Sequence, residues 1–263
     1  MDFVKDYKKL GIEVECLHAS PLWLSANAIR YSHDNHDKSD TLLKPHSLIV
    51  NDVYDGEYGL CTTEYGIYGV CGDKDKDLIQ RVGCKMKHES VLEMIDFTFS
   101  IHGVSRALLQ ELVRHRISSL PVQSSRYVLH KLLKEEKPFV YYIDGAEYYD
   151  FSRAEKYLMF PLKAEDSDWL YKSQVTQLEL LRIGVSKGAS NDVLKYLIPE
   201  SFRTKLQYKI NLRSLRNLLE LRTSKDALWE FRYHCGALIA NIPEEYHYLL
   251  EDVIKFDGTA HIP

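Results

Sequence analysis

Residues 94–116 read MIDFTFSIHGVSRALLQELVRHR, and the spacing of their apolar side chains changes halfway along. In the first half alternate positions are apolar, namely Ile95, Phe97, Phe99 and Ile101. This alternation predicts a strand with one buried face, which Gly103 is expected to end. Ser105 has a side chain suited to a helix N-cap, and the leucines after it recur at helical spacing. The stretch therefore predicts a strand followed directly by a helix that ends in the cationic residues 114–116.

The rest of the chain shows further helices and few strands. A second strand is expected at residues 139–143. Helical spacing extends over residues 25–30, 73–87, 168–184, 191–198, 211–222 and 225–240. Strands interspersed with helices, and a helix-rich C-terminal half, indicate an α+β (mixed α/β) fold with an antiparallel or mixed sheet. We expect one domain over residues 1–263, in which residues 33–72, rich in Asp, His, Gly and Tyr, form a loop or hairpin insertion.

The composition is that of a globular protein in a reducing compartment. Lys and Arg number 34 against 38 Asp and Glu, a formal charge of −4, so the summed field does not favour a nucleic acid as partner. Five scattered cysteines without a CxxC pair argue against a disulfide framework and a zinc knuckle. Neither a signal peptide nor an apolar run of about 20 residues is visible. We therefore expect a soluble, cytoplasmic protein without a membrane segment.

The densest polar signal is the segment Arg114–Tyr127, which reads RHRISSLPVQSSRY. Three arginines, a histidine, four serines and a glutamine lie within its 14 residues, so hydrogen-bond donors far outnumber acceptors. Such a segment suits an oxyanion-rich ligand, and the guanidinium groups at both ends favour a nucleotide phosphate. A solvated basic helix end is the alternative, because the helix dipole favours cations at a C-terminus.

A second signal lies in the predicted helix 211–222. Arg213, Asn217 and Glu220 share one face of this helix, whereas Arg222 falls on the apolar face. A guanidinium there must snorkel to water, pair with a carboxylate, or meet an anionic or carbonyl-bearing ligand.

Residues 88–93 and the histidines of the insertion raise the possibility of a metal site. The motif HExxH is absent, and Ser90 with Glu93 matches a helix capping box. His33, His36 and His46 have irregular spacing. We therefore predict no metal site.

The residues Arg114-His115-Arg116, then seven residues, then Ser124, followed by Ser125-Arg126-Tyr127, are similar to the RHR-x7-S signature of the flavin-dependent thymidylate synthases. The similarity extends to other segments in the same order, at residues 28–32, 88–93, 105–109, 211–215 and 221–222. It covers most of the chain outside residues 33–72.

The resemblance implies an enzyme, a methyltransferase that makes dTMP from dUMP. Its carbon donor would be 5,10-methylenetetrahydrofolate, its redox cofactor FAD, and its reductant NADPH. It would act as a homotetramer whose active sites lie at subunit interfaces.

The resemblance also implies roles for particular residues. FAD would be bound by residues near the RHR segment and on the late helix, namely His88, Ser90, Glu93, Arg114, His115, Arg116, Ile117, Asn211, Arg213 and Asn217. The dUMP site would comprise Glu111, Arg114, Val122, Gln123, Ser124, Ser125, Arg126, Lys195 and Arg222. Arg222 would be catalytic, approaching the uracil base and favouring its N3-deprotonated form.

The chain departs from the family pattern at five positions. Pro121 stands where the family often has Asn, Val122 where it has Glu, and Glu111 where it has Gln. Lys195 replaces a common Arg and so loses the bidentate fork, and Asp226 replaces a common His.

Two other functions stay open at this point. The basic, serine-rich turn with Tyr127 could serve a nucleotide- or RNA-binding module without redox chemistry. Alternatively, the arginines of the helices could form only inter-subunit ion pairs.

Overall fold

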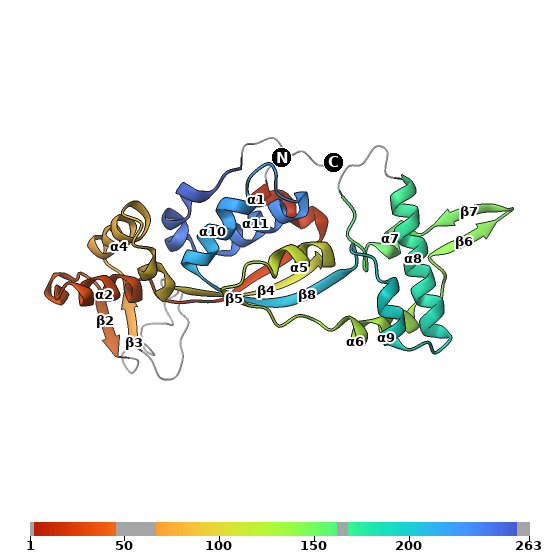
Figure 1. The fold of residues 1–263 in the computed structure, drawn as a ribbon, viewed down its shortest axis with the longest axis horizontal. Helices are drawn as coiled ribbons and strands as arrows, with labels where there is room; N and C mark the ends of the chain where they lie inside the picture. Colours follow the sequence, from red (N-terminus) through yellow and green to blue (C-terminus); the bar gives the residue numbers. More distant parts are fainter. Residues whose placement is uncertain (1–2, 46–66, 162–167, 257–263) are drawn as a thin grey trace, which may run out of the picture.

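The computed structural model describes residues 3–45, 67–161 and 168–256. Its centre is a four-stranded antiparallel sheet in the order β1-β4-β8-β5 (Figure 1). The strands are β1 (Glu13–Ala19), β4 (Asp96–Ser105), β5 (Ser118–Ser119) and β8 (Arg203–Asn211). The mixed α+β character and the antiparallel sheet confirm the fold class expected from the sequence.

The alternating stretch is strand β4, as predicted, and its apolar face is completely buried at Phe97, Phe99 and Ile101. The prediction that Gly103 ends the strand is wrong. The strand continues to Ser105 through a bulge, where the register with β8 shifts between His102 and Val104. Gly103 has φ +78°, and a Cβ there would overlap the carbonyl oxygen of Gly11. The glycine therefore allows a bend and a close backbone contact instead of a stop.

Two strands of the sheet lead directly into helices through side-chain caps. The hydroxyl of Ser105 accepts a hydrogen bond from the Leu108 amide at the start of α5 (Arg106–Leu112), as predicted. Asn211 does the same for the Ser214 amide at the start of α10 (Leu212–Arg222). These caps fix where each helix leaves the sheet, and with it the side chains near each helix end.

Helices cover one face of the sheet (Figure 1). Besides α5 and α10 they are α1 (Phe3–Asp6) and α11 (Trp229–Asn241). The helix predicted at residues 225–240 corresponds to α11, which begins four residues later than predicted, at Trp229. Helix α11 is buried almost throughout, and Gly236 lets the backbone of Phe3 pack directly on it. This layer and the sheet form the larger of two hydrophobic cores.

A second hydrophobic core lies beyond one end of the sheet, among residues 129–202 (Figure 1). Its elements are α6 (Ser125–Leu129), β6 (Val140–Ile143), β7 (Ala146–Tyr149), α7 (Phe151–Ala154), α8 (Asp168–Ser186) and α9 (Asn191–Leu194). The strand predicted at 139–143 and the helix predicted at 168–184 are confirmed. The helix predicted at 191–198 is shorter, because a 3-10 turn replaces it from Lys195 to Leu197.

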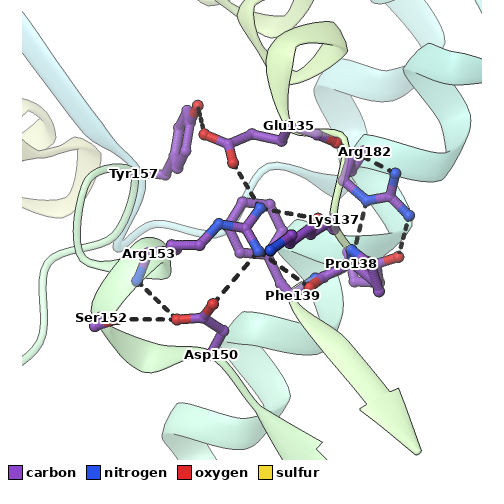
Figure 2. Close-up of polar contacts among 10 residues, drawn as sticks. Glu135, Lys137, Pro138, Phe139, Asp150, Ser152, Arg153, Tyr157 and Arg182 are labelled. Carbon is purple, nitrogen blue, oxygen red and sulfur yellow. Dashed lines mark hydrogen bonds and ion pairs between the residues drawn. The ribbon is translucent and has the colours of Figure 1, made fainter.

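A network of charged side chains braces this second core (Figure 2). The Arg153 guanidinium donates to Glu135 at 2.6 Å and also reaches Asp150, and it lies over the Phe139 ring. The Tyr157 hydroxyl donates to the same Glu135 at 2.8 Å. These half-buried contacts tie the segment after α6 to the residues of and after α7.

The predicted insertion begins after α2 (Trp23–Ser32), which confirms the short helix expected at 25–30. Strands β2 (Leu42–Pro45) and β3 (Ile67–Val70) form an antiparallel pair, and residues 46–66 lie outside the described part of the chain. The chain resumes in α4 (Asp73–Ile79), which continues as a π-helical turn to Lys85. Within the described ranges, no helix has the length and apolar character needed to cross a membrane.

Candidate active site

The cationic segment runs along the free edge of strand β8. Ser118 pairs with Ile210, and Val122 forms a bridge with Leu206 further along the same strand. Four residues of strand separate these two pairings, which corresponds to roughly 13 Å. The two ends of the segment are therefore held at different places, with His115 against Arg222 at the end of α10 and Arg126 against Asp192 of α9.

Arg222 has the carboxylate partner that its place on an apolar helix face requires. Its Nη1 lies 2.6 Å from Oε2 of Glu111, and its Nε donates to Nε2 of His115 at 3.2 Å. The guanidinium also lies over the Phe231 ring, 4.9 Å from the centroid. Side chains from α5, α10 and α11 thus meet in one cluster, and the snorkelling alternative is wrong because only 19% of the Arg222 side chain is exposed.

His115 is neutral in this arrangement. Its Nε2 can accept a hydrogen bond from Arg222 only when that nitrogen carries no proton. Burial, then the charge of Arg222 and that of Arg114, lower the pKa of His115, against the opposing effect of Glu111. At neutral pH the cluster therefore contains the Arg222 cation, the Glu111 carboxylate and a neutral imidazole.

A second group of predicted residues lies where β4 begins and α10 starts. Arg213 pairs with Glu93 at 2.6 Å and with Glu89 at 3.4 Å. The capping box of Ser90 and Glu93 does not form, because the 3-10 turn Glu89–Met94 has no side-chain cap and Glu93 binds Arg213 instead. Several predicted cofactor residues here are exposed to solvent, namely His88, Ser90, Glu93, Arg213 and Asn217.

Arg114, Arg116 and Ile117 are exposed as well, and Ile117 is 68% exposed although it is apolar. Other large apolar side chains stay exposed on the same segment and its neighbours, at Met94, Val113 and Leu221. The predicted cofactor residues therefore form an open surface of donors interspersed with apolar groups. Asn211 is partly committed to the fold, since its Oδ1 caps α10.

A third group surrounds the Ser124–Arg126 turn. Arg126 pairs with Asp192 at 3.2 Å, and the Asn191 side chain donates to the Arg126 carbonyl at 2.8 Å. Lys195 follows directly after α9 and is exposed, as are Ser124 and Val122. The backbone N–H of Gln123 donates a hydrogen bond to the backbone carbonyl of Lys205 in β8. The Ser124–Arg126 turn is thus joined to α9 through Arg126, and Lys195 follows that helix.

A single chain does not bring all the predicted substrate residues together. Figure 1 shows α6 and α9 beyond the end of the sheet, well away from α10. Glu111 and Arg222 meet, whereas the polar contacts of Arg126 with other elements, within the described part of the chain, are with Asn191 and Asp192 of α9. Arg213 and Arg222 lie at opposite ends of α10, about 14 Å apart at the rise of an α-helix.

Sequence reasoning missed two partners of these groups. Phe231, the ring beneath Arg222, lies in a predicted helix but carries no sequence signal that links it to residue 222. Glu230, next to it, is buried and accepts a 2.7 Å hydrogen bond from the Ser105 amide at the start of α5. Its burial raises the pKa of the Glu230 carboxyl, which the bonds from Ser105 partly offset.

Among the described residues, no group of three or more His, Cys, Asp or Glu side chains is placed to hold a metal ion. His33 bonds to Ser32 and to the Ile29 carbonyl, and the ring of His36 meets that of Tyr31 edge-to-face. His46 lies outside the described residues.

Comparison with known proteins identifies the family. Residues 21–246 match the family model described as thymidylate synthase complementing protein. The flavin-dependent thymidylate synthase of Wolinella succinogenes is 46% identical over 178 residues, which cover 68% of this chain and 81% of that protein. The enzyme of the same name from Helicobacter pylori strain J99 is 39% identical over 245 residues, covering 93% and 100%.

The fold of this chain also matches a solved structure of a protein with the same activity in its name. The crystal structure of thymidylate synthase X from Helicobacter pylori with FAD and dUMP superimposes with a TM-score of 0.73 at 38% identity, and covers 92% of this chain and 99% of that one. Both the sequence and the fold are therefore shared over nearly the full length. This chain belongs to the flavin-dependent thymidylate synthase family.

Proposed function

We propose that this chain catalyses the reductive methylation of dUMP to dTMP, with 5,10-methylenetetrahydrofolate as carbon donor and NADPH as reductant. The observation that carries the proposal is the Arg222 cluster, a half-buried guanidinium held by Glu111, His115 and Phe231 in a member of this family. Four free cysteines in the described residues fit a cytoplasmic location.

The donor set fits FAD. Arg114, Arg116 and Arg213 are exposed cations that suit a pyrophosphate, and Ile117 offers an apolar contact beside them. FAD, when bound, supplies the hydride-transfer chemistry of the reaction, while the protein supplies binding and orientation. Arg213 is already partly neutralised by Glu89 and Glu93, so these carboxylates orient its guanidinium before a ligand arrives.

The donors for dUMP fall into two parts. Arg126, Lys195 and Ser124 suit the 5′-phosphate, because they present charged and hydroxyl donors on one surface. Arg222 suits the uracil carbonyl, since a fixed cation in a partly dry site stabilises negative charge on the base. Lys195 contributes a point charge without a fork, so it orients the phosphate less strictly than an arginine would.

We further propose that neighbouring copies in a homotetramer complete each site. Within one chain the phosphate donors and Arg222 are apart, and one nucleotide must reach both. The exposed apolar side chains Met94, Val113, Ile117 and Leu221 surround the cofactor residues, and a subunit contact would bury them. In an assembly with closed symmetry, every site would combine the phosphate donors of one chain with Arg222 of a neighbouring chain.

Mixing two inactive variants tests this assembly. Arg126→Ala and Arg222→Ala are each expected to be inactive, but tetramers that contain both chains should regain about a quarter of wild-type activity, because one site in four then combines two intact contributors. Co-expression with two affinity tags and tandem purification yields such tetramers. Two differently tagged copies of the same variant serve as the control. Mixed tetramers as inactive as their parents would show that each site lies within one chain.

Product formation tests the function itself. The purified protein with FAD, NADPH, methylenetetrahydrofolate and dUMP should yield dTMP, measured by chromatography and mass, and omission of the folate should abolish it. Binding of RNA or nucleotides with steep salt dependence, without flavin and without dTMP, would support a binding module in its place.

A further inference from the structure

The Arg222 guanidinium is held on three sides and open on the fourth. Nη1 pairs with Glu111, Nε donates to His115, and one face lies over Phe231. Among the described residues, Nη2 has no hydrogen-bond partner. The two N–H groups of Nη2 therefore remain available in a defined direction.

Glu111 is itself placed rigidly. It lies in the last turn of α5, whose first turn is capped by the Ser105 hydroxyl and anchored to the buried carboxylate of Glu230 in α11. Arg222 ends α10, which is capped at its other end by Asn211. Both partners of the 2.6 Å ion pair thus sit on helix ends whose positions the sheet and α11 determine.

The carboxylate is unsuited to contact the substrate directly. The resemblance implied that Glu111 binds dUMP, as a glutamine in its place would. Its Oε2 is occupied by Arg222, and a carboxylate next to a uracil base that gains negative charge would repel it. Its effect on the substrate must then pass through the arginine.

We propose that Glu111 is a positioning residue, which fixes the plane of the Arg222 guanidinium so that Nη2 faces the pyrimidine. This inference rests on the proposed function above. Glu111 also balances the charges around His115, which is faced by Arg222 from α10, by Arg114 after α5 and by the uncharged Phe231 from α11. The ion pair therefore controls both the direction of the guanidinium and the protonation of the imidazole that it donates to.

The affinity for dUMP should depend on pH through His115, and the direction of this dependence can be derived. A proton on His115 Nε2 would set two donors against each other and release Arg222, so substrate affinity falls as the pH drops through the pKa of His115. The carboxylate of Glu111 raises that pKa, against the larger lowering effects of burial and Arg222. Its replacement by glutamine should therefore move the acid limb of dUMP binding to lower pH.

The test compares Glu111→Ala and Glu111→Gln in the FAD-loaded enzyme. Calorimetric titration with dUMP should show affinity reduced about tenfold in Glu111→Ala, since a charge-assisted contact is lost. Glu111→Gln keeps an acceptor for Nη1, so it should recover most of the affinity and shift the acid limb downward. The control is Glu220→Gln, at a position on the same helix as Arg222. It removes only the surface ion pair of Glu220 with Lys255, so it should change neither the affinity for dUMP nor its pH dependence.

Several results would overturn the proposed role of Glu111. Wild-type affinity in Glu111→Ala, or an unshifted acid limb in Glu111→Gln, would overturn the inference while leaving the proposed function intact. Equal losses of affinity in both variants, in proportion to a fall in Tm, would show a purely structural role and also overturn it. A wild-type enzyme that carries FAD but binds no dUMP would overturn the proposed function together with the inference.

Discussion

Arg222→Ala should lower the rate of dTMP formation about 100-fold or more while the protein keeps its flavin and its assembly. The guanidinium is a preorganised cation in a site where only 19% of its side chain meets solvent, so water replaces it poorly. Turnover at saturating dUMP measures the loss. Because the expected contact forms with the charged base, kcat should fall at least as much as the affinity for dUMP.

Arg222→Lys separates charge from geometry. Lysine keeps the positive charge but loses the fork that bonds His115 and Glu111 at once and the flat face that stacks on Phe231. Its activity should fall between that of the wild type and that of the alanine variant. If instead Arg222→Ala breaks the oligomer, as measured by size-exclusion chromatography, the arginine serves subunit contacts and the catalytic assignment is wrong.

Asp75→Ala should lower the free energy of unfolding by about 3–5 kcal/mol, because it leaves a buried cation without its partner. Asp75 is 1% exposed and pairs with Arg30, whose Nε donates to it at 2.6 Å. Hydroxyls from the base of the insertion, Ser39 and Thr41, donate to its other oxygen at 2.5 and 2.6 Å. The substitution therefore breaks a link among α2, α4 and the segment just before β2 in one step.

Urea unfolding measures this loss, and Asp73→Ala is the matched control on the same helix. Asp73 is 99% exposed and lies 3.8 Å from Lys76, so its removal should change stability by less than about 1 kcal/mol. A loss from Asp75→Ala as small as the control's would contradict the buried pair.

The pH dependence of Asp75 follows from its surroundings. Burial alone would raise the pKa of Asp75, but the hydrogen bonds from Ser39, Thr41 and Arg30 together outweigh it and lower the pKa. The carboxylate therefore contributes its full stability above the pKa of the unfolded chain, about 3.9, and loses it as the pH falls toward the lower folded value. The difference between wild type and Asp75→Ala should accordingly be constant near neutral pH and shrink below about pH 4.

Local periodicity was sufficient where one strand or helix carries its own signal. The alternating residues of β4, the cap at Ser105 and the helices α8 and α10 follow from the sequence. Strand β8 was not predicted, although Leu206, Tyr208 and Ile210 alternate with exposed lysines and a glutamine. Its polar positions and the absence of a turn signal before α10 hid the pattern within an apparently helical region.

Ion pairs between residues far apart in the chain could not be predicted from the sequence. The helix position of Arg222 required a partner, yet Glu111 lies more than a hundred residues away, and no local pattern links the two positions. Arg216 was overlooked on the same helix. It is 3% exposed and makes two 2.7 Å bonds to Asp252, a contact that depends on where the C-terminal segment folds back.

Donor chemistry alone singled out the segment Arg114–Tyr127 as an anion site, whereas the division of its residues between FAD and dUMP came from the family resemblance. In the structure the two ends of this segment are separated along strand β8, because the segment is extended there. The proposed division of the site between copies also came from the resemblance, since no sequence pattern within one chain indicates it.

The absorption spectrum of the purified protein, recorded before and after NADPH and dUMP are added, tests the account most directly. We predict a yellow protein whose flavin bands respond to dUMP and disappear on reduction by NADPH. A colourless protein that cannot be reconstituted with FAD would contradict the assignment of the donor surface at Arg114–Arg116 and Arg213.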